Sequence, residues 1–193
     1  MKARPNSNRA GFSLVVLVFS LSILTFLGGV VSMRASGMTN KARAAKIISM
    51  VESLRTPVVL YREDTGAWPI EYSNRTGANV HRLAFDPGVT GWEGPYIEDP
   101  IRRSMNPTGG TVNLYNQIPN GFTNSNGIDI DGDGTSDYAG TQGSIILFTG
   151  IDEEIAVKVD AAFDEGLAGT WSDAGRVEYN TARRQLAVLV ASN

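Results

Sequence analysis

The sequence contains no cysteine and only one histidine, His81. The lack of cysteine excludes disulfide bonds, a thiol nucleophile and a cysteine-ligated metal, and a single histidine excludes a centre built from several imidazoles. Neither a G-x-S-x-G elbow nor a phosphate-binding loop occurs. We therefore expect that the protein is not an enzyme, and that His81, in the polar stretch "NVHRL", is an ordinary surface or hinge residue.

Positive charge is scarce as well. Lysine and arginine number 17 against 20 acidic residues, which gives a formal net charge of −3. A chain of this charge lacks the basic surface that binds phosphate backbones, so we expect no nucleic-acid partner. Its 193 residues, 42% of them hydrophobic, suffice for one helical anchor and one compact domain.

What the sequence does have is a long uncharged run, Phe12–Val31. As a helix these residues would reach about 30 Å, the thickness of the hydrocarbon core of a bilayer. The run is longer than the apolar part of a secretory leader, and Arg34 spoils the cleavage site that such a leader would need. Lys2, Arg4 and Arg9 precede it, which predicts a transmembrane helix with a cytoplasmic amino terminus.

The residues at the start of this run, Gly11-Phe12-Ser13-Leu14, resemble the prepilin signature of type IV pilins and type II secretion pseudopilins. The resemblance implies that a prepilin peptidase cleaves after Gly11 and that Phe12 becomes N-methylated. The apolar helix would then be retained, first as an anchor and later as part of a filament core. It also implies three partners: like subunits, the peptidase, and an assembly platform in the inner membrane.

One position departs from the family pattern. The fifth residue of the mature chain is normally glutamate, and here it is Val16. A carboxylate at this point pairs with the amino-terminal ammonium of a neighbouring subunit, which is costly to bury alone. A subunit at the filament tip has no such amine to pair with. Val16 therefore fits a tip or minor subunit, or a lineage in which the pairing is replaced.

The helical pattern continues beyond the apolar run. Apolar residues recur at spacings of three and four, which predicts one helix that packs on a sheet: Ile47, Val51, Leu54, Val58 and Tyr61. Pro57 should bend this helix, and Gly66 should end it. The stretch "YREDTGAWP" resembles the end of the pseudopilin helix, and "GWEGPYIEDP" resembles a segment of the major, G-type pseudopilins.

Short elements are predicted in the remainder. "TVNLY" and "SIILFT" are candidate strands, and "RVEY" and "QLAVLV" read as a final hairpin. Thr149 and Asp152 resemble a capping box, and a helix is expected over Asp152–Glu165.

These patterns predict an α+β fold. A long N-terminal helix, with a transmembrane half and an amphipathic half, packs on a small antiparallel sheet, and the loop-rich head carries an additional C-terminal helix and hairpin. The expected divisions are a cleaved leader over residues 1–11, the helix over residues 12–66, and a pilin-like head over residues 67–193.

The clearest chemical signal is "DIDGDGTSDYAG", residues 129–140, which we call the acidic loop. Carboxylates stand at the first, third, fifth and ninth positions, as in an EF-hand-like calcium loop, and a glycine stands at the sixth. The twelfth position, normally a bidentate acid, is a glycine, so water or a distant acid would complete the shell. The predicted Ca²⁺ ligands are Asp129, Asp131, Asp133, the carbonyl of Thr135 and Asp137, with Asp152 or Glu153 as possible additions. The alternative is a solvated acidic loop without a metal.

Together these observations predict a structural subunit of a type IV pilus or a type II secretion pseudopilus. It would pass once through the bacterial inner membrane by Phe12–Val31 and then enter a periplasmic or surface filament, with a head stabilised by Ca²⁺. The alternative is a calcium-dependent adhesin or cargo-binding minor subunit at the filament tip. A membrane-anchored calcium protein that never assembles is a third possibility.

Overall fold

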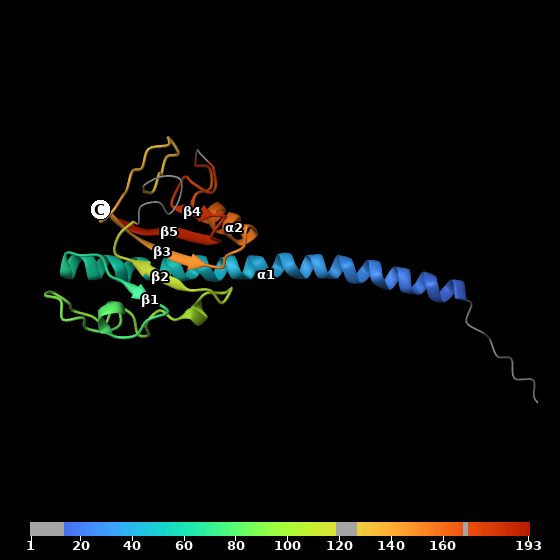
Figure 1. Cartoon of the computed structure of the whole chain (residues 1–193), viewed down its shortest axis with the longest axis horizontal. Helices are drawn as coiled ribbons and strands as arrows, with labels where there is room; N and C mark the ends of the chain where they lie inside the picture. Colours follow the sequence, from blue (N-terminus) through green and yellow to red (C-terminus); the bar gives the residue numbers. More distant parts are fainter. Residues whose placement is uncertain (1–13, 119–126, 168–169) are drawn as a thin grey trace, which may run out of the picture. The chain divides into compact units, whose positions relative to one another are not determined.

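The computed structural model describes residues 14–118, 127–167 and 170–193. The chain divides into two units, Met1–Thr39 and Asn40–Asn193. The secondary structure consists of helix α1 (Leu14–Thr65), strand β1 (Glu71–Tyr72), strand β2 (Val112–Tyr115), strand β3 (Gly143–Thr149), helix α2 (Glu153–Phe163), strand β4 (Val177–Asn180) and strand β5 (Gln185–Ser192), with 3-10 turns at Ala78–Val80 and Arg103–Met105 (Figure 1).

Helix α1 runs without interruption through Pro57. In the second unit it buries one stripe of side chains at the predicted spacing, and the members are each at most 5% exposed: Ala44, Ile47, Val51, Leu54, Val58 and Tyr61. The helix ends where Gly66 adopts a positive φ of 72° and its N–H donates to the Arg62 carbonyl. This is the left-handed glycine termination that the sequence predicted.

The sheet of the second unit has five antiparallel strands in the order β1-β2-β3-β5-β4. Strand β3 lies at its centre, and six of its seven residues are buried. Strand β5 comes last in the sequence but lies between β3 and β4. A sheet whose central strands are buried must be covered on both faces, and in this head each face is covered by its own hydrophobic cluster.

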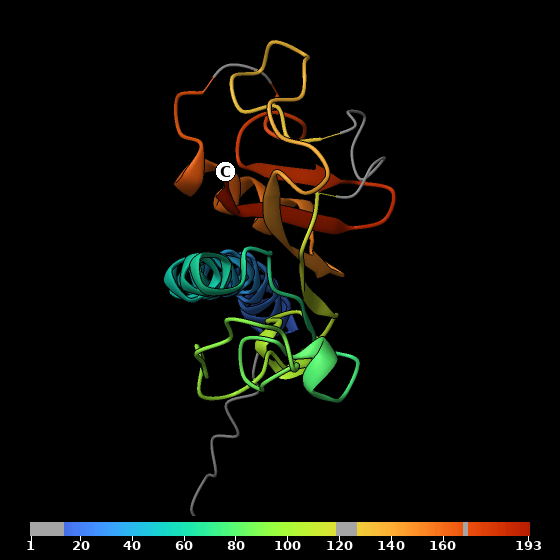
Figure 2. The same ribbon diagram turned by 90° about the vertical axis from the view of Figure 1, so that its left-hand side faces the viewer.

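The two faces of the sheet carry separate hydrophobic clusters. The larger cluster joins α1 and α2 to side chains such as Ile146, Phe148 and Val188. The smaller one lies on the other face, where Ile118 and Ile128 cover the following sheet residues: Ile145, Leu147, Ala187 and Leu189. In Figure 2 the acidic loop, drawn in gold, lies on this second face, away from α1.

Helix α2 is amphipathic and begins at Glu153, with Asp152 at its N-cap position and no side-chain capping bond. The predicted capping box is therefore wrong. Thr149 ends strand β3, where its hydroxyl accepts a bond from the Thr111 N–H and cannot cap a helix three residues on. The final hairpin, β4 with β5, forms as the sequence predicted.

No helix within the described residues combines the length and the apolar character needed to cross a membrane. The predicted fold class is therefore wrong in its transmembrane half. The predicted single-pass location in the inner membrane is wrong on the same finding.

Candidate metal centre in the acidic loop

A short pairing of backbone groups closes the neck of the acidic loop. The Ile128 N–H donates to the Tyr138 carbonyl at 2.8 Å, and the Tyr138 N–H returns a bond to the Ile128 carbonyl at 3.1 Å. The side chain of Ile128 is only 1% exposed and belongs to the smaller hydrophobic cluster. The first carboxylate of the loop therefore follows a residue that is fixed to the sheet.

Three carboxylates of the loop converge. One oxygen from each of Asp129, Asp131 and Asp137 lies within 4.8 Å of the other two. Asp129 is 3% exposed, whereas Asp131 and Asp137 face solvent to a greater extent. The group is buried on one side and open to solvent on the other, so an ion bound there could be coordinated by protein oxygens and by water.

Backbone N–H groups hold these carboxylates in place. Asp129 accepts from Gly132 and Gly134, each at 2.8 Å, and Asp137 accepts from Ile130 at 2.8 Å. Gly132 and Gly134 have φ values of 73° and 86°, a conformation that glycine adopts without strain. The loop therefore turns sharply enough to bring its first carboxylate close to its last.

Oxygen donors without histidine or cysteine suit a hard cation, and Ca²⁺ takes six to eight of them. Three carboxylates this close repel each other strongly unless a cation lies between them. Asp133 lies outside the converging group, and its Oδ1 accepts the Thr135 N–H at 2.7 Å. Three of the predicted carboxylate ligands thus converge, and the role of the Thr135 carbonyl stays a prediction.

The structure places the two additional acids elsewhere. Asp152 pairs with Arg184 at the start of α2, and Glu153 begins the first turn of that helix. Neither belongs to the converging group. Gly11 and Phe12, the predicted cleavage and methylation residues, lie outside the described residues.

One buried polar site was missed at the sequence level. His81 is 6% exposed, so the expectation of a surface residue is wrong. Its Nδ1 lies 2.9 Å from Glu71, which is fully buried, and its Nε2 lies 2.9 Å from the Arg75 carbonyl. Since a carbonyl only accepts, Nε2 carries a proton. No sequence signal pairs these residues, which are ten positions apart on an unpredicted strand and turn.

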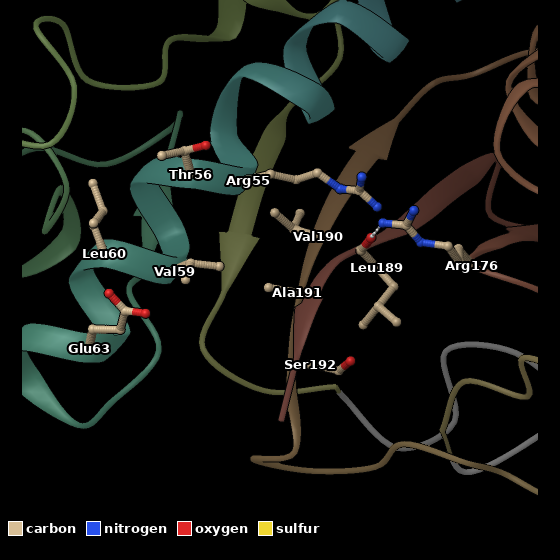
Figure 3. A pocket seen from close by; sticks show the side chains of 10 residues that line it. All are labelled: Arg55, Thr56, Val59, Leu60, Glu63, Arg176, Leu189, Val190, Ala191 and Ser192. Carbon is tan, nitrogen blue, oxygen red and sulfur yellow. Dashed lines mark hydrogen bonds between the residues drawn. The ribbon is translucent and has the colours of Figure 1, made fainter.

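A surface groove of about 490 Å³ lies between α1 and strand β5. Figure 3 shows the guanidinium groups of Arg55 and Arg176 pointing toward one another across it. Arg176 donates to the Leu189 carbonyl at 3.0 Å, and Arg55 lies 3.4 Å from Glu52. The groove thus carries two guanidinium groups and one carboxylate, that of Glu63.

No protein-family model, no curated protein and no solved structure matches this chain.

Proposed function

We propose that this chain is a structural subunit of a pilin-like filament, of the kind that type IV pili and type II secretion pseudopili form. A prepilin peptidase would remove residues 1–11, and copies would assemble through the first half of α1. The observation that carries the proposal is the exposed apolar surface of that segment. The proposal does not depend on a membrane-spanning helix.

This surface covers the whole circumference of the helix. Its large hydrophobic side chains are between 49% and 79% exposed: Leu14, Val15, Val16, Leu17, Val18, Phe19, Leu21, Ile23, Leu24, Phe26 and Leu27. A helix that is apolar on every side requires an apolar environment. An exposed patch of this kind marks an interaction site, and equivalent helices of other copies would bury it in a filament.

The hydroxyl side chains described within residues 14–29 are already satisfied. The hydroxyls of Ser20, Ser22 and Thr25 donate to carbonyls one turn earlier, at 2.8 to 3.1 Å. No donor on these side chains would be left without a partner when the helix is buried. The segment can therefore enter an apolar filament core without the cost of desolvating unpaired hydroxyls.

Calcium would act on the head of the subunit. An ion held by Asp129, Asp131 and Asp137 would fix the acidic loop, and with it Ile128 over the second face of the sheet. Since no cysteine is present, a metal would supply the cross-link that a disulfide supplies in other small extracellular domains.

Replacement of Phe26 by aspartate tests the proposal, because this side chain is 71% exposed on the apolar segment. The matched control is Phe85→Asp, which changes a 46% exposed phenylalanine of the head in the same way. We expect filaments, counted by electron microscopy, in cells that produce the wild type or Phe85→Asp and none with Phe26→Asp. Normal filaments with Phe26→Asp would exclude assembly through this surface.

A second candidate is a calcium-dependent adhesin or cargo-binding minor subunit at the filament tip. The observation in its favour is the absence of an acidic residue from α1 before Glu52, with valine at position 16. A tip subunit needs no carboxylate there, because it has no neighbouring amine to pair with. Copy number distinguishes the two, since a tip subunit occurs once or a few times per purified filament and a main subunit many times.

A further inference from the structure

A second pair of carboxylates lies at the end of α2, close to the acidic loop, since Gly175, which faces Asp164, donates its N–H to the Asp129 carbonyl at 2.6 Å. Asp160 lies in the last turn of the helix, and Asp164 follows one turn later, its N–H bonded to the Asp160 carbonyl at 2.8 Å. The buried side of α2 is otherwise apolar, with Ile155, Ala156 and Val159 in the core. The pair therefore stands where the hydrophobic face of the helix ends.

The residues around Asp164 bury its side chain and leave room for its carboxylate. It is 8% exposed, and its Oδ2 accepts the Val177 N–H at 2.8 Å. Gly175 faces it, and a Cβ at that position would lie 2.6 Å from the Asp164 carboxylate carbon. The absence of a side chain on Gly175 thus makes the room in which this carboxylate sits.

No salt bridge among the described residues compensates the negative charge of the pair. Asp164 Oδ1 and Asp160 Oδ1 are both shielded from water and have no hydrogen-bond partner among the described residues. Arg176, which directly precedes β4, donates to the Leu189 carbonyl and lies over the Phe163 ring at 5.6 Å. A buried carboxylate oxygen without a partner costs several times what a paired one does.

Both carboxylates line a pocket of about 290 Å³ whose wall offers further oxygens. The pocket is completed by Glu165, the Thr170 hydroxyl and Trp171, which stacks on Tyr179 with ring centroids 5.5 Å apart. A pocket of this size admits an ion with several waters. Neither histidine nor cysteine is among the lining residues, so the donor set suits calcium and not zinc.

Burial also disfavours the ionised form of both groups. It raises the pKa of Asp160 to about 6, with the charge of Asp164 as a second cause, and it likewise raises the pKa of Asp164 to about 6.

We propose that Asp160 and Asp164 form a second calcium site in the pocket at the end of α2, separate from the acidic loop. The two carboxylates are its anionic ligands, their Oδ1 atoms turning toward the pocket when the ion binds, and Thr170 and water complete the shell. The site does not depend on filament assembly, since all of these residues belong to the head.

Calcium titration of the full chain, kept monodisperse in detergent, tests the site. We expect the wild type to bind two ions per chain by calorimetry. Asp160→Asn with Asp164→Asn should bind one, at the acidic loop, and the matched pair Asp129→Asn with Asp131→Asn should also bind one, at α2. Equal calcium stoichiometry in the wild type and in the α2 variant would overturn the proposal and leave a carboxyl pair that shares protons.

Terbium provides a readout that is specific to the pocket. In Asp129→Asn with Asp131→Asn, which leaves only the site at α2, Tb³⁺ would be sensitised by Trp171, so emission excited through tryptophan should fall sharply when Trp171→Phe is added while one calcium ion still binds. Emission that is unchanged in Trp171→Phe would place the ion elsewhere and refute the site. If the double variant fails to fold, Asp160→Asn alone keeps the bond from Val177 and should weaken one calcium site about tenfold, and an unchanged affinity would again refute it.

Discussion

Glu71 and Asp164 are both buried carboxylates, and their surroundings differ. Glu71 accepts from the Leu83 N–H at 2.8 Å and the Ile101 N–H at 3.3 Å, and His81 lies against it. Burial raises its pKa, and these hydrogen bonds oppose the rise. Glu71 is thus a saturated structural group that ties β1 to two loops. Asp164 keeps one oxygen without a partner, so only Asp164 is available to a ligand.

At the acidic loop we predict that Asp131→Asn removes the share of calcium stabilisation that this loop contributes and leaves the share from the site at α2. Asp131 belongs to the converging carboxylates, whereas Asp133 does not, so Asp133→Asn is the matched control. At calcium a hundredfold above Kd, occupancy adds about 2.7 kcal/mol to the free energy of unfolding, or roughly 5–10 °C in Tm. Thermal melts of the full chain with calcium and with chelator measure this difference.

Two results would contradict this assignment. Identical melts of the wild type in calcium and in chelator would show that calcium does not stabilise the head through this loop. A loss of the calcium effect in Asp133→Asn equal to that in Asp131→Asn would show that the ligand set follows the EF-hand-like spacing and not the observed convergence.

The sequence predicted the residue-level site in part. Alternating carboxylates with glycines between them signal a loop that turns its acids inward, and three of the four predicted carboxylates do converge. The sequence does not distinguish Asp133 from these three. Which carboxylates converge depends on the hydrogen bonds that backbone N–H groups make to their oxygens, and these form only in the folded loop. Glu71, His81 and Asp164 escaped prediction because burial of a charged side chain depends on contacts between distant segments.

At the scale of elements, hydrophobic periodicity predicted the longer helices and strands and missed the shortest strand. The stripe on α1, strand β3, helix α2 and the last hairpin follow repeating apolar patterns that hydrophobic burial enforces. Strand β1 has two residues, too few for a period of two to be visible. The capping box failed since Thr149 is held by its neighbour across the sheet edge.

Helix α2 carries a pH dependence whose sign follows from its carboxyl pair. The pKa of Asp160 and of Asp164 is about 6 in the folded protein, against 3.8 as the ordinary value. A group with a raised pKa binds its proton more tightly in the folded state, so it stabilises the fold as pH falls below 6. We predict that the calcium-free chain gains on the order of 2 kcal/mol between pH 7 and pH 5 relative to Asp160→Asn with Asp164→Asn, after allowance for solvent screening.

Urea denaturation at the two pH values in chelator measures this gain. The double variant keeps every other titrating group, including Glu71, so it cancels their contributions. A wild type that loses stability relative to the variant on acidification would contradict the assigned sign. In calcium the dependence should shrink, because an ion at the pair replaces the proton.

At the scale of the whole molecule, the proposed processing has a direct signature in mass. We predict that the protein isolated from its native cells begins at Phe12, lacks residues 1–11 and carries one additional methyl group. Intact-mass spectrometry with amino-terminal sequencing measures both changes, and Gly11→Ala with Phe12→Ala should leave the leader in place. A chain that begins well beyond Val31 would exclude the filament proposal, since the apolar segment would be gone.

The position of β5 in the sheet sets an order of events during synthesis. Strand β5 follows every other strand in the sequence, yet it lies between β3 and β4. A growing chain can pair β1, β2 and β3, but β4 has no neighbour to join until β5 has left the ribosome. Until then the centre of the sheet is an open edge with apolar faces, the kind of intermediate that chaperones protect. The sheet of the head can therefore be completed only after Ser192, the last residue of β5, has been synthesised.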